Sequence, residues 1–573
     1  MKKIAIIGFG PRGLHALECF FKEYSKLQNE IPFEITIFEE KKELGSGNVW
    51  NQNQSDANWL NISERALENL EGRKRIELAN YEIPSFLSYK DWSVKNYGCK
   101  DFFLKDSFPP RSKMGKYLNE RANSILNIVS NKQVKICKEK ILNVDIDDDK
   151  IIITTINNLK YNFHEVLLAI GHQPTEKSED ILTLENEANS IDGTFLSKTY
   201  PIENIIDSNK IDNNTNVAIR GFGLAMIDAV RALTTKRGGK FTITNDFDLS
   251  CVFKTSAKVP KKIIPYSLDG LPMVPKPLNA KIDSFFTPSK NQLKSFEDEL
   301  KSSIKSNSKT EILKKLLNLL AEIAANKYYN HPNKITKNKI SEEELIYISK
   351  RWLLDESYKH ELIVDRDLSA INQLIKFTEM ATQKKAVSLD YCIGQIIRHC
   401  QPTMYKTLSH AKIADKNMSE IIEFDERMKR YSYGPPVEST QQLIALNNAG
   451  ILELTFANNP KRFIKNNVWF FSKSDKKINI DVIINSVLDG PKLLKVKSKL
   501  VKDLLKNDIL QPVHSNLGVE TNKDGTVISK ENDFIPISVI GRLAKGSVIG
   551  VDAILECFGP RVNDWAKGCV SRL

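Results

Sequence analysis

The stretch KKIAIIGFGPRGLHALECFF, residues 2–21, decides the fold. Residues 4–7 are apolar, mostly β-branched and end at a glycine, which predicts a short buried strand of a parallel sheet. A glycine turn follows, and after it apolar residues recur at helical spacing, at Leu14, Leu17, Phe20 and Phe21. We therefore predict a strand, a glycine turn and a helix, in that order.

A second strand, Phe33–Phe38, completes a βαβ unit with the glycine turn in its first connection. In such a unit Gly8 permits the tight turn, Gly10 lets the backbone approach a diphosphate, and Gly13 lets the helix pack closely on the strand. The start of the helix then faces the phosphates with free N–H groups and a partial positive charge. The pattern predicts a dinucleotide site, which also includes Phe9, Pro11 and Arg12.

Glu39 ends the second strand, where an acidic residue accepts hydrogen bonds from ribose hydroxyls. Its carboxylate would repel a 2′-phosphate, so the first site is expected to hold FAD or NAD rather than NADP. A glycine turn without a ligand is the alternative, and the agreement of strand, helix and acidic strand end disfavours it.

A second turn of the same kind begins after the apolar strand Asn216–Arg220. It contains Gly221 and Gly223 and leads through Leu224 and Ala225 into a helix. The third glycine is absent, so the helix is expected to pack less closely on its strand. Two such turns in one chain predict two dinucleotides, a bound flavin and a nicotinamide carrier.

The fold class predicted from this order is α/β, with two Rossmann-like dinucleotide-binding domains and an all-helical insertion. The FAD-binding domain is assigned to residues 1–190 and is completed by residues 510–573. The NAD(P)H-binding domain is assigned to residues 205–288 and 436–509. Residues 289–435 carry apolar residues at helical spacing among lysines and glutamates, which predicts the insertion.

Composition excludes several classes of protein. The 573 residues are 41% hydrophobic and 27% charged, as in a folded soluble protein, and the net charge of +12 favours anionic partners. Lysines are spread along the chain and no nucleic-acid-binding motif is present. The eight cysteines form no CxxC pair, so neither a zinc ribbon nor a disulfide framework is expected. No signal peptide or spanning helix is predicted, and a cytoplasmic location is expected.

Landmarks along nearly the whole chain resemble the flavin- and NAD(P)-binding family that includes the FAD-dependent urate hydroxylase and the aspartate N-monooxygenase of nitrosuccinate pathways. The first landmarks are the Gly8–Leu14 turn, Phe38-Glu39 and the Gly45–Trp50 segment. The others are Trp59–Ile62, Phe108–Arg111, Gly115–Leu118, Ala169–His172, Gly221–Ala225 with Asp228, Arg237–Phe241, Gly270–Pro272, Gly541-Arg542, Gly546-Ser547 and Asp552. Many of them are common to flavoprotein monooxygenases in general.

The resemblance implies which residues contact the two cofactors. The FAD contacts it implies are Gly8, Gly10, Gly13, Glu39, the Gly45–Trp50 segment with Ser46 and Gly47, Ala169, Gly171 and Asp552. Gly221, Gly223 and the helix start after them would contact the nicotinamide carrier. Arg111 and Arg12 could each contact a phosphate, since guanidinium groups suit that geometry, although Arg12 is equally consistent with a solvated helix.

The activity that the resemblance implies is that of an NAD(P)H-consuming, FAD-dependent monooxygenase, in which NADPH, with NADH as an alternative, reduces FAD. Reduced FAD then reacts with molecular oxygen to a C4a-(hydro)peroxyflavin. The substrate is expected to be a small polar, anionic metabolite, with amino-acid N-oxygenation favoured. Two alternatives stay open: a flavin-dependent reductase or dehydrogenase that oxygenates nothing, and a non-catalytic nucleotide-binding protein. A homo-oligomer is also left open.

Few residues are candidates for direct chemistry. His172 follows the third strand and could reach flavin or substrate, or it could only order its own turn. Arg398-His399-Cys400 has helical spacing with Cys392 and no second ligand cluster, so we expect buried thiols and no metal. The basic segment Lys254–Lys262, with Lys258 and Lys261, could meet the 2′-phosphate of NADPH or be an exposed lysine loop.

Overall fold

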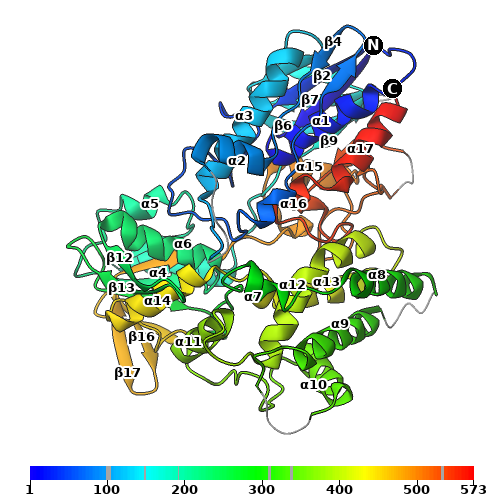
Figure 1. Ribbon diagram of the computed structural model, residues 1–573. Coiled ribbons are helices and arrows are strands. Elements are labelled where there is room, and N and C mark those ends of the chain that lie inside the picture. The colour runs from blue at the N-terminus through cyan, green and yellow to red at the C-terminus, as the bar shows by residue number, and fades with distance from the viewer. Residues whose placement is uncertain (99–104, 148–149, 192, 307–311, 336–339, 531–533) are drawn as a thin grey trace.

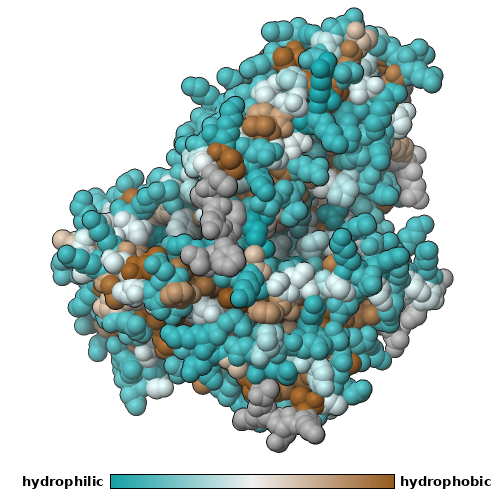
Figure 2. All heavy atoms as spheres, viewed as in Figure 1, coloured by the Kyte–Doolittle hydropathy of each residue, from teal (hydrophilic) through white to brown (hydrophobic). Residues whose placement is uncertain are grey.

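The computed structural model describes residues 1–98, 105–147, 150–191, 193–306, 312–335, 340–530 and 534–573. They form two units, each built on a parallel sheet, and a helical part (Figure 1). The predicted α/β fold class with two Rossmann-like units is therefore confirmed. Hydrophilic residues cover most of the face seen in Figure 2, and hydrophobic residues lie there in scattered groups.

The first unit, at the top of Figure 1, contains a five-stranded parallel sheet. Its strands lie in the order β19 (Ile537–Val539), β9 (Glu165–Leu168), β1 (Lys2–Ile7), β2 (Phe33–Phe38) and β5 (Val134–Cys137). Alternate residues of β1 are buried on opposite faces, with Ile4 and Ile6 on one side and Ala5 and Ile7 on the other. Such burial on both faces explains the unbroken apolar run of this strand.

Helices cover one face of this sheet and a meander covers the other. On the first face lie α1 (Pro11–Tyr24), α3 (Arg111–Val129), α16 (Ile554–Cys557) and α17 (Pro560–Ser571). On the second lie β6 (Ile141–Asp147), β7 (Lys150–Thr155), β8 (Lys160–Phe163) and α15 (Lys499–Lys506). The smaller elements of the unit are β3 (Ile76–Leu78), β4 (Tyr81–Ile83), α2 (Tyr89–Tyr97) and the 3-10 turns 66–69 and 542–544. The C-terminal helix thus packs beside the first helix of the chain (Figure 1).

The second unit contains a four-stranded parallel sheet. Its strands lie in the order β10 (Thr194–Leu196), β18 (Val482–Asn485), β11 (Asn216–Arg220) and β14 (Lys262–Tyr266). One face packs on α5 (Glu203–Ile206), α6 (Leu224–Leu233) and α14 (Val437–Asn448). The other packs on α4 (Glu179–Ser190) and the meander β15 (Lys461–Lys465), β16 (Val468–Lys473) and β17 (Lys476–Ile480). A hairpin of β12 (Lys240–Asn245) and β13 (Ser250–Lys254) lies beside α14.

The two units repeat the same plan. In the first unit β1, which precedes the glycine turn, lies between β2 and β9. In the second unit β11, which precedes the other glycine turn, lies between β14 and β18. In both units one neighbour follows the helix after the turn, and the other follows the meander. Leu452 makes a parallel bridge to Ile263 in β14, and Asn458 makes one to Ser267 just after it, in the place that β5 takes beside β2. The repeat therefore extends well beyond the two glycine turns.

The helical part lies between β14 and α14, at the lower right of Figure 1. Its helices are α7 (Ala280–Ser284), α8 (Lys290–Lys305), α9 (Ile312–Tyr329), α10 (Glu342–Leu354), α11 (Ala370–Ala381), α12 (Leu389–Leu408) and α13 (Asp415–Ser432). Their apolar faces form one large core, which also takes in Val513, Leu517 and Ile549 from the C-terminal segment. The chain returns to the first unit earlier than residue 510, because the 3-10 turn 493–495 and α15 already pack against it.

A buried ion cluster fastens α1 to α3. Glu18 on α1 is 4% exposed, and it accepts hydrogen bonds from Arg121 on α3 at 2.8 and 2.9 Å and from Arg73 at 3.0 Å. Burial acts against the charged form, but Arg121 and His15 outweigh it and hold the pKa of Glu18 well below its usual range. The cluster holds the helix that begins at the first glycine turn.

We expect Glu18→Gln to lower the free energy of unfolding by about 3–5 kcal/mol, because two buried guanidinium groups lose their counter-charge. Lys26→Gln is the matched control, since it removes an exposed partner of Glu23 and should change stability by less than about 1 kcal/mol. Urea denaturation of both variants measures the difference. Equal denaturation midpoints would contradict a role for this cluster in stability.

Candidate functional site

The first glycine turn lies at the carboxyl edge of the first sheet. Gly8 adopts φ +89° and its N–H donates to the carbonyl of Phe38 at 2.9 Å, which fixes the turn between β1 and β2. On the other side, the N–H of Ala169 donates to the carbonyl of Ile7 at 2.9 Å. Ligands of parallel α/β sheets bind at this edge, outside the carboxyl ends of the strands.

The three glycines of this turn have different surroundings. A Cβ at Gly8 would lie 2.7 Å from the carbonyl oxygen of Ala169, and one at Gly13 would lie 2.4 Å from the carbonyl oxygen of Gly8. A Cβ at Gly10 would meet nothing closer than Gly47 Cα at 3.5 Å. Gly8 and Gly13 are thus required by packing, whereas Gly10 leaves room for a ligand at the start of α1. The turn fits a diphosphate held by backbone amides.

Glu39 reaches the same turn. Its carboxylate accepts a hydrogen bond from the N–H of Phe9 at 2.9 Å and another from the N–H of Lys41 at 3.2 Å. Phe9 itself is fully buried. A carboxylate held beside the turn can accept hydrogen bonds from ribose hydroxyls, as the sequence predicts.

The Gly45–Trp50 segment lies between the first turn and α3. Gly45 donates its N–H to the carbonyl of Phe9 at 2.8 Å, and a Cβ on Gly45 would lie 2.6 Å from that of Ala122. Ser46 and Trp50 are 1% and 9% exposed. Their side chains therefore serve packing, and the backbone around Gly47 is the part that borders the Gly10 opening.

The second glycine turn repeats this geometry with small differences. Gly221 adopts φ +107° and donates to the carbonyl of Tyr266 at 2.8 Å, and a Cβ there would lie 2.6 Å from Ser486 Oγ. A Cβ at Gly223 would meet only Met273 Sδ, at 4.0 Å, so this position is open as Gly10 is. Leu224 then begins α6 and Ala225 is buried in it.

The start of α6 differs from the start of α1. Its first helical hydrogen bond, from Ile227 to Gly223, is 3.4 Å long, and the equivalent bond of α1, from Leu14 to Gly10, is 2.9 Å. Met226 stands where Gly13 stands in the first unit and is 1% exposed. A buried side chain thus stands where the first unit has a glycine, and looser packing of α6 on its strand stays a prediction.

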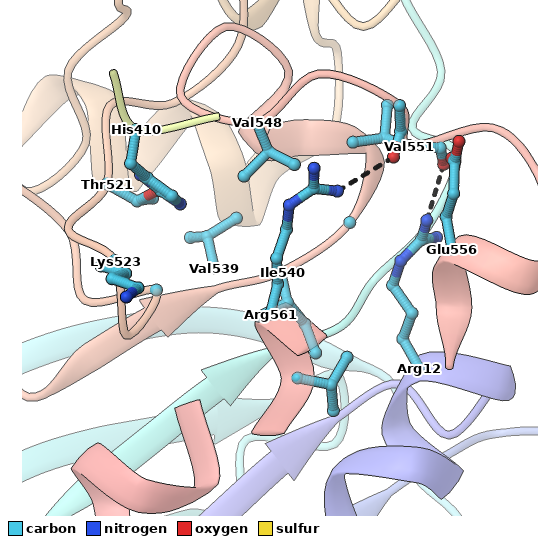
Figure 3. A pocket seen from close by; sticks show the side chains of 14 residues that line it. Arg12, His410, Thr521, Lys523, Val539, Ile540, Val548, Val551, Glu556 and Arg561 are labelled. Atoms are coloured by element: carbon cyan, nitrogen blue, oxygen red, sulfur yellow. Dashed lines mark hydrogen bonds between the residues drawn. The ribbon is translucent and has the colours of Figure 1, made fainter. Parts of the chain in front are cut away.

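Arg12 points away from the first turn. Its Nη2 donates to the carbonyl of Val551 at 2.7 Å, and a Cβ at Gly541 would lie 2.7 Å from Arg12 Cδ. Arg12, Arg561, Glu556 and His410 line a small pocket, and all four are labelled in Figure 3. Arg12 therefore fastens α1 to the C-terminal segment, and a phosphate contact from it stays a prediction.

Glu556 is a carboxyl group held near neutrality. Burial, together with the charge of Asp552, raises the pKa of Glu556 to about 7, against the opposing effect of Arg12. Its Oε2 accepts a hydrogen bond from the N–H of Ala553 at 3.2 Å. It can therefore hold or release a proton near neutral pH.

His172 lies at the carboxyl end of β9, close to Arg542 and Asp552. Its Nε2 is 3.5 Å from Nη1 of Arg542. The surrounding protein displaces bulk water and, with the charge of Arg542, lowers the pKa of His172 to about 4, although the side chain is exposed. His172 is thus neutral at pH 7 and can accept a proton or a hydrogen bond.

Asp552 joins the C-terminal segment to the helical part. It accepts hydrogen bonds from Arg542 at 2.6 Å and from Lys429 on α13 at 2.7 Å. Burial favours the neutral acid, but these two cations outweigh it and keep the pKa of Asp552 well below its usual range. A direct contact of Asp552 with flavin stays a prediction.

Arg111 lies between the two units. It donates to Asp228 on α6 at 2.8 Å and to the carbonyl of Trp59 at 3.2 Å. Tyr200 donates to the same Asp228 oxygen at 2.7 Å. This buried group ties α3 of the first unit to the helix that begins at the second glycine turn, and a phosphate contact from Arg111 stays a prediction.

The basic segment Lys254–Lys262 lies at the wrong end of the second sheet for the role considered from the sequence. Lys262 begins β14, and the N–H of Lys261 donates to the carbonyl of Thr215, just before β11. Both strands are parallel, and the glycine turn follows their other, carboxyl ends. A five-residue strand spans roughly 13 Å, so the prediction that these lysines meet the 2′-phosphate is wrong.

The residues near Arg398 do not form a metal site. His399 Nε2 lies 3.0 Å from Asp283 Oδ1, while Cys392 and Cys400 are buried, as predicted. Cys99 lies outside the described residues. Within the described ranges, no group of three or more His, Cys, Asp or Glu side chains could hold a metal ion, and no helix has the length and hydropathy of a membrane span.

The sequence did not indicate three cations near the proposed sites. Lys429 and Arg542 bond to Asp552, and Lys276 lies where the first unit meets the helical part. Lys429 lies in α13, whose periodicity indicated only a helical core, and Arg542 stood out only as the neighbour of Gly541. Lys276 donates to the carbonyl of Asn61, which brings the segment after β14 to the first unit. Nothing local in the sequence marks Lys429 or Lys276.

The part of the chain that contains the first glycine turn is similar to a known protein family. Residues 5–173 match the family model described as FAD-NAD(P)-binding. Nitrosuccinic acid synthase npaA of Aspergillus oryzae is 22% identical over 571 residues, which cover 90% of this chain and 83% of that protein. Uncharacterized protein YdhS of Escherichia coli is 25% identical over 254 residues, or 42% of this chain, and the match spans 40% of the length of that relative.

Solved structures resemble the chain at lower identity. An ornithine N-hydroxylase of Kutzneria sp. 744 is 10% identical, with a TM-score of 0.46, over 99% of this chain and 98% of its own. A cyclohexanone monooxygenase is 12% identical, with a TM-score of 0.45, over all of this chain and 88% of its own. These similarities concern overall shape and bear on no activity.

The match of residues 5–173 covers the first glycine turn, Glu39 and the strand β9. The expected binding of FAD or NAD(P) by this part of the chain is therefore supported by the family model as well as by the geometry. Residues 5–173 are thus similar to domains of the FAD-NAD(P)-binding type.

Proposed function

We propose that the protein is an FAD-dependent, NAD(P)H-consuming monooxygenase that oxygenates a small polar, anionic metabolite, with N-oxygenation of an amino acid favoured. The observation that carries this proposal is the pair of equivalent glycine turns, each of which opens a helix at the carboxyl edge of a parallel sheet. Two dinucleotide sites in one chain suit hydride transfer from a nicotinamide to a flavin. The name of the A. oryzae relative, whose product is a nitro dicarboxylic acid, supports an anionic substrate.

The chain's own residues supply binding and electrostatics. The amides at the start of α1 would hold the diphosphate of FAD, and Glu39 would hold its ribose. The amides at the start of α6 would hold the nicotinamide dinucleotide. The flavin, when bound, supplies hydride acceptance and the reaction with oxygen. Arg111 and Asp228 would keep the two sites in one orientation.

Lys276 supports an anionic substrate where the first unit meets the helical part, whereas Lys429 is already paired with Asp552 and Glu426. Burial, with the repulsion of Arg398, lowers the pKa of Lys276 to about 7, although Asp283 and Asp106 oppose this. A carboxylate bound beside Lys276 would favour its charged form. Lys429 lies nearer the C-terminal segment, bonded to Asp552.

Oxygen transfer separates the monooxygenase from a flavin reductase. With ¹⁸O₂, we expect amino acids bearing a second carboxylate to accelerate NADPH oxidation and to yield a product that contains one labelled oxygen atom. Mass spectrometry measures the label. Accelerated oxidation with no label in any product would favour the reductase, and a purified protein that neither shows flavin absorbance nor gains it with FAD would favour the non-catalytic protein.

The two open glycines assign the two cofactors. Because a Cβ at Gly10 or Gly223 would make only ordinary van der Waals contacts, Gly10→Val and Gly223→Val should keep the fold and obstruct only a ligand. Gly10→Val should lose the flavin, and Gly223→Val should remain yellow but resist reduction by NADPH. Absorbance spectra and anaerobic stopped-flow reduction measure both. The opposite pattern would mean that the cofactors are assigned to the wrong units.

Because the pKa of His172 is low, we expect its side chain to keep the same charge throughout the range around neutral pH. Its proton is lost as pH rises through about 4, so between pH 6 and 8 it is neutral throughout. His172→Asn should change the rate of flavin reduction by the same factor at every pH in this range. The rate is measured by stopped flow from pH 6 to 8. A pH midpoint in this range that vanishes in His172→Asn would contradict the assignment.

A further inference from the structure

The hydrogen bonds around the two glycine turns identify equivalent residues in the two units. The N–H of Gly8 donates to the carbonyl of Phe38, and that of Gly221 donates to the carbonyl of Tyr266. The next residue along each of these strands is therefore equivalent as well. In the first unit that residue is Glu39, and in the second it is Ser267.

The neighbouring strand gives the same equivalence independently. Glu39 donates its N–H to the carbonyl of Cys137 at 3.1 Å, at the end of β5. Ser267 donates its N–H to the carbonyl of Ala457 at 2.9 Å, in the segment that takes the place of β5 beside β14. Ser267 thus occupies the position that decides which ribose a Rossmann-like unit accepts.

The two positions differ in charge. The carboxylate of Glu39 stands at the first turn, held by the N–H of Phe9. The equivalent N–H in the second unit is that of Phe222, and no hydrogen bond from it occurs within the residues that the structure describes. Within the described residues, no carboxylate is thus bonded to the second turn as Glu39 is bonded to the first.

Two cations lie one residue away from Ser267, Arg366 across Asp269 and Lys473 across Asn458. Arg366, in the loop before α11, has its Nη2 3.9 Å from Asp269 Oδ2 and its Nη1 3.5 Å from Glu356. These long distances leave its guanidinium group able to bind another anion. Lys473 donates to the carbonyl of Asn458 at 2.9 Å, and Asn458 bridges to Ser267. Both cations come from elements outside the βαβ unit.

Asp269 is the acidic group closest to this position, and its own turn holds it. Its Oδ1 accepts hydrogen bonds from Ser267 Oγ at 3.0 Å and from the N–H of Leu271 at 3.2 Å. Its Oδ2 faces Arg366. Gly270 locks the turn, because it has φ +65° and a Cβ there would lie 2.5 Å from Asn458 Cβ. Asp269 is therefore directed into its own turn.

We propose that Ser267 and Arg366 make the second unit selective for a nicotinamide dinucleotide that carries a 2′-phosphate. Ser267 admits the phosphate because it brings no charge to the place that Glu39 fills in the first unit. Arg366 binds the phosphate, and Lys473 adds to the positive charge around it. The inference deepens the proposed function, because it names the reductant.

Titration calorimetry measures the binding of 2′,5′-ADP and of 5′-AMP to the purified full chain. This experiment tests the inference without any turnover. We expect 2′,5′-ADP to bind at least tenfold more tightly. Ser267→Glu, which copies Glu39, should weaken 2′,5′-ADP by about tenfold or more, since one repelling charge at this range is worth about 1.4 kcal/mol. It should leave 5′-AMP within about twofold.

Arg366→Gln should weaken 2′,5′-ADP by a similar factor and leave 5′-AMP unchanged. The matched control is Lys359→Gln, since Lys359 lies in the same loop and pairs with Asp367. It should change neither ligand. Asp269→Asn should leave 2′,5′-ADP binding intact or strengthen it, because it removes a negative charge near the phosphate.

Equal affinity of the two nucleotides, or loss of 5′-AMP but not 2′,5′-ADP in Asp269→Asn, would overturn the inference, because Asp269 would then hold an unphosphorylated ribose. Circular dichroism spectra confirm that each variant is folded, and Arg366→Gln tests the same site if Ser267→Glu unfolds. Failure of the proposed function is a separate result. A chain that binds 2′,5′-ADP selectively but incorporates no oxygen would be an NADPH-dependent reductase.

Discussion

The close approach of a backbone amide to a diphosphate is the constraint on which the rest of the structure depends. It requires a turn with no side chain in the path, a helix that starts directly behind it, and a strand edge that holds the turn. Gly8, Gly10 and Gly13 meet these needs in the first unit, with the first and third packed against backbone and the middle one open. The helix is held in turn by Glu18 and its two arginines.

The repetition of this constraint organises the whole chain. In both units a meander precedes the strand that pairs with the turn-bearing strand on its other side. In both, the chain also carries an insertion between the second strand and a later helix that packs on the same sheet, α3 in the first unit and α14 in the second. In the first unit this insertion includes residues 40–98 and 105–110, and in the second it is the helical part. The helical part thereby reaches the first unit, where Lys429 bonds to Asp552 and Arg65 to Asp283.

Electrostatics distinguish the two otherwise similar turns. Glu39 brings a carboxylate to the first, and Ser267 with Arg366 brings a neutral side chain and a cation to the second. The pKa values of Asp552 and Glu556 shift in opposite directions. Three cations at salt-bridge distance lower the pKa of Asp552, whereas burial raises the pKa of Glu556, which meets no cation at that distance within the described residues. Both carboxyl groups lie in the C-terminal segment that Arg12, at the first turn, contacts through the carbonyl of Val551.

The glycine turns, their strands and helices, and the helical character of residues 289–435 followed from the sequence alone, because strand length, glycine spacing and helical periodicity are local properties of the chain. Glu39 was also found in this way. The partners of Arg12, Arg111 and Asp552 were not, since each of them bonds to residues more than 100 positions away or on another element. Lys254–Lys262 looked suitable from charge, yet the direction of β14 places it at the far end of the sheet. Which strand end a residue occupies, and which distant charge it meets, is a matter of chain direction and packing in three dimensions, and only the tertiary structure decides it.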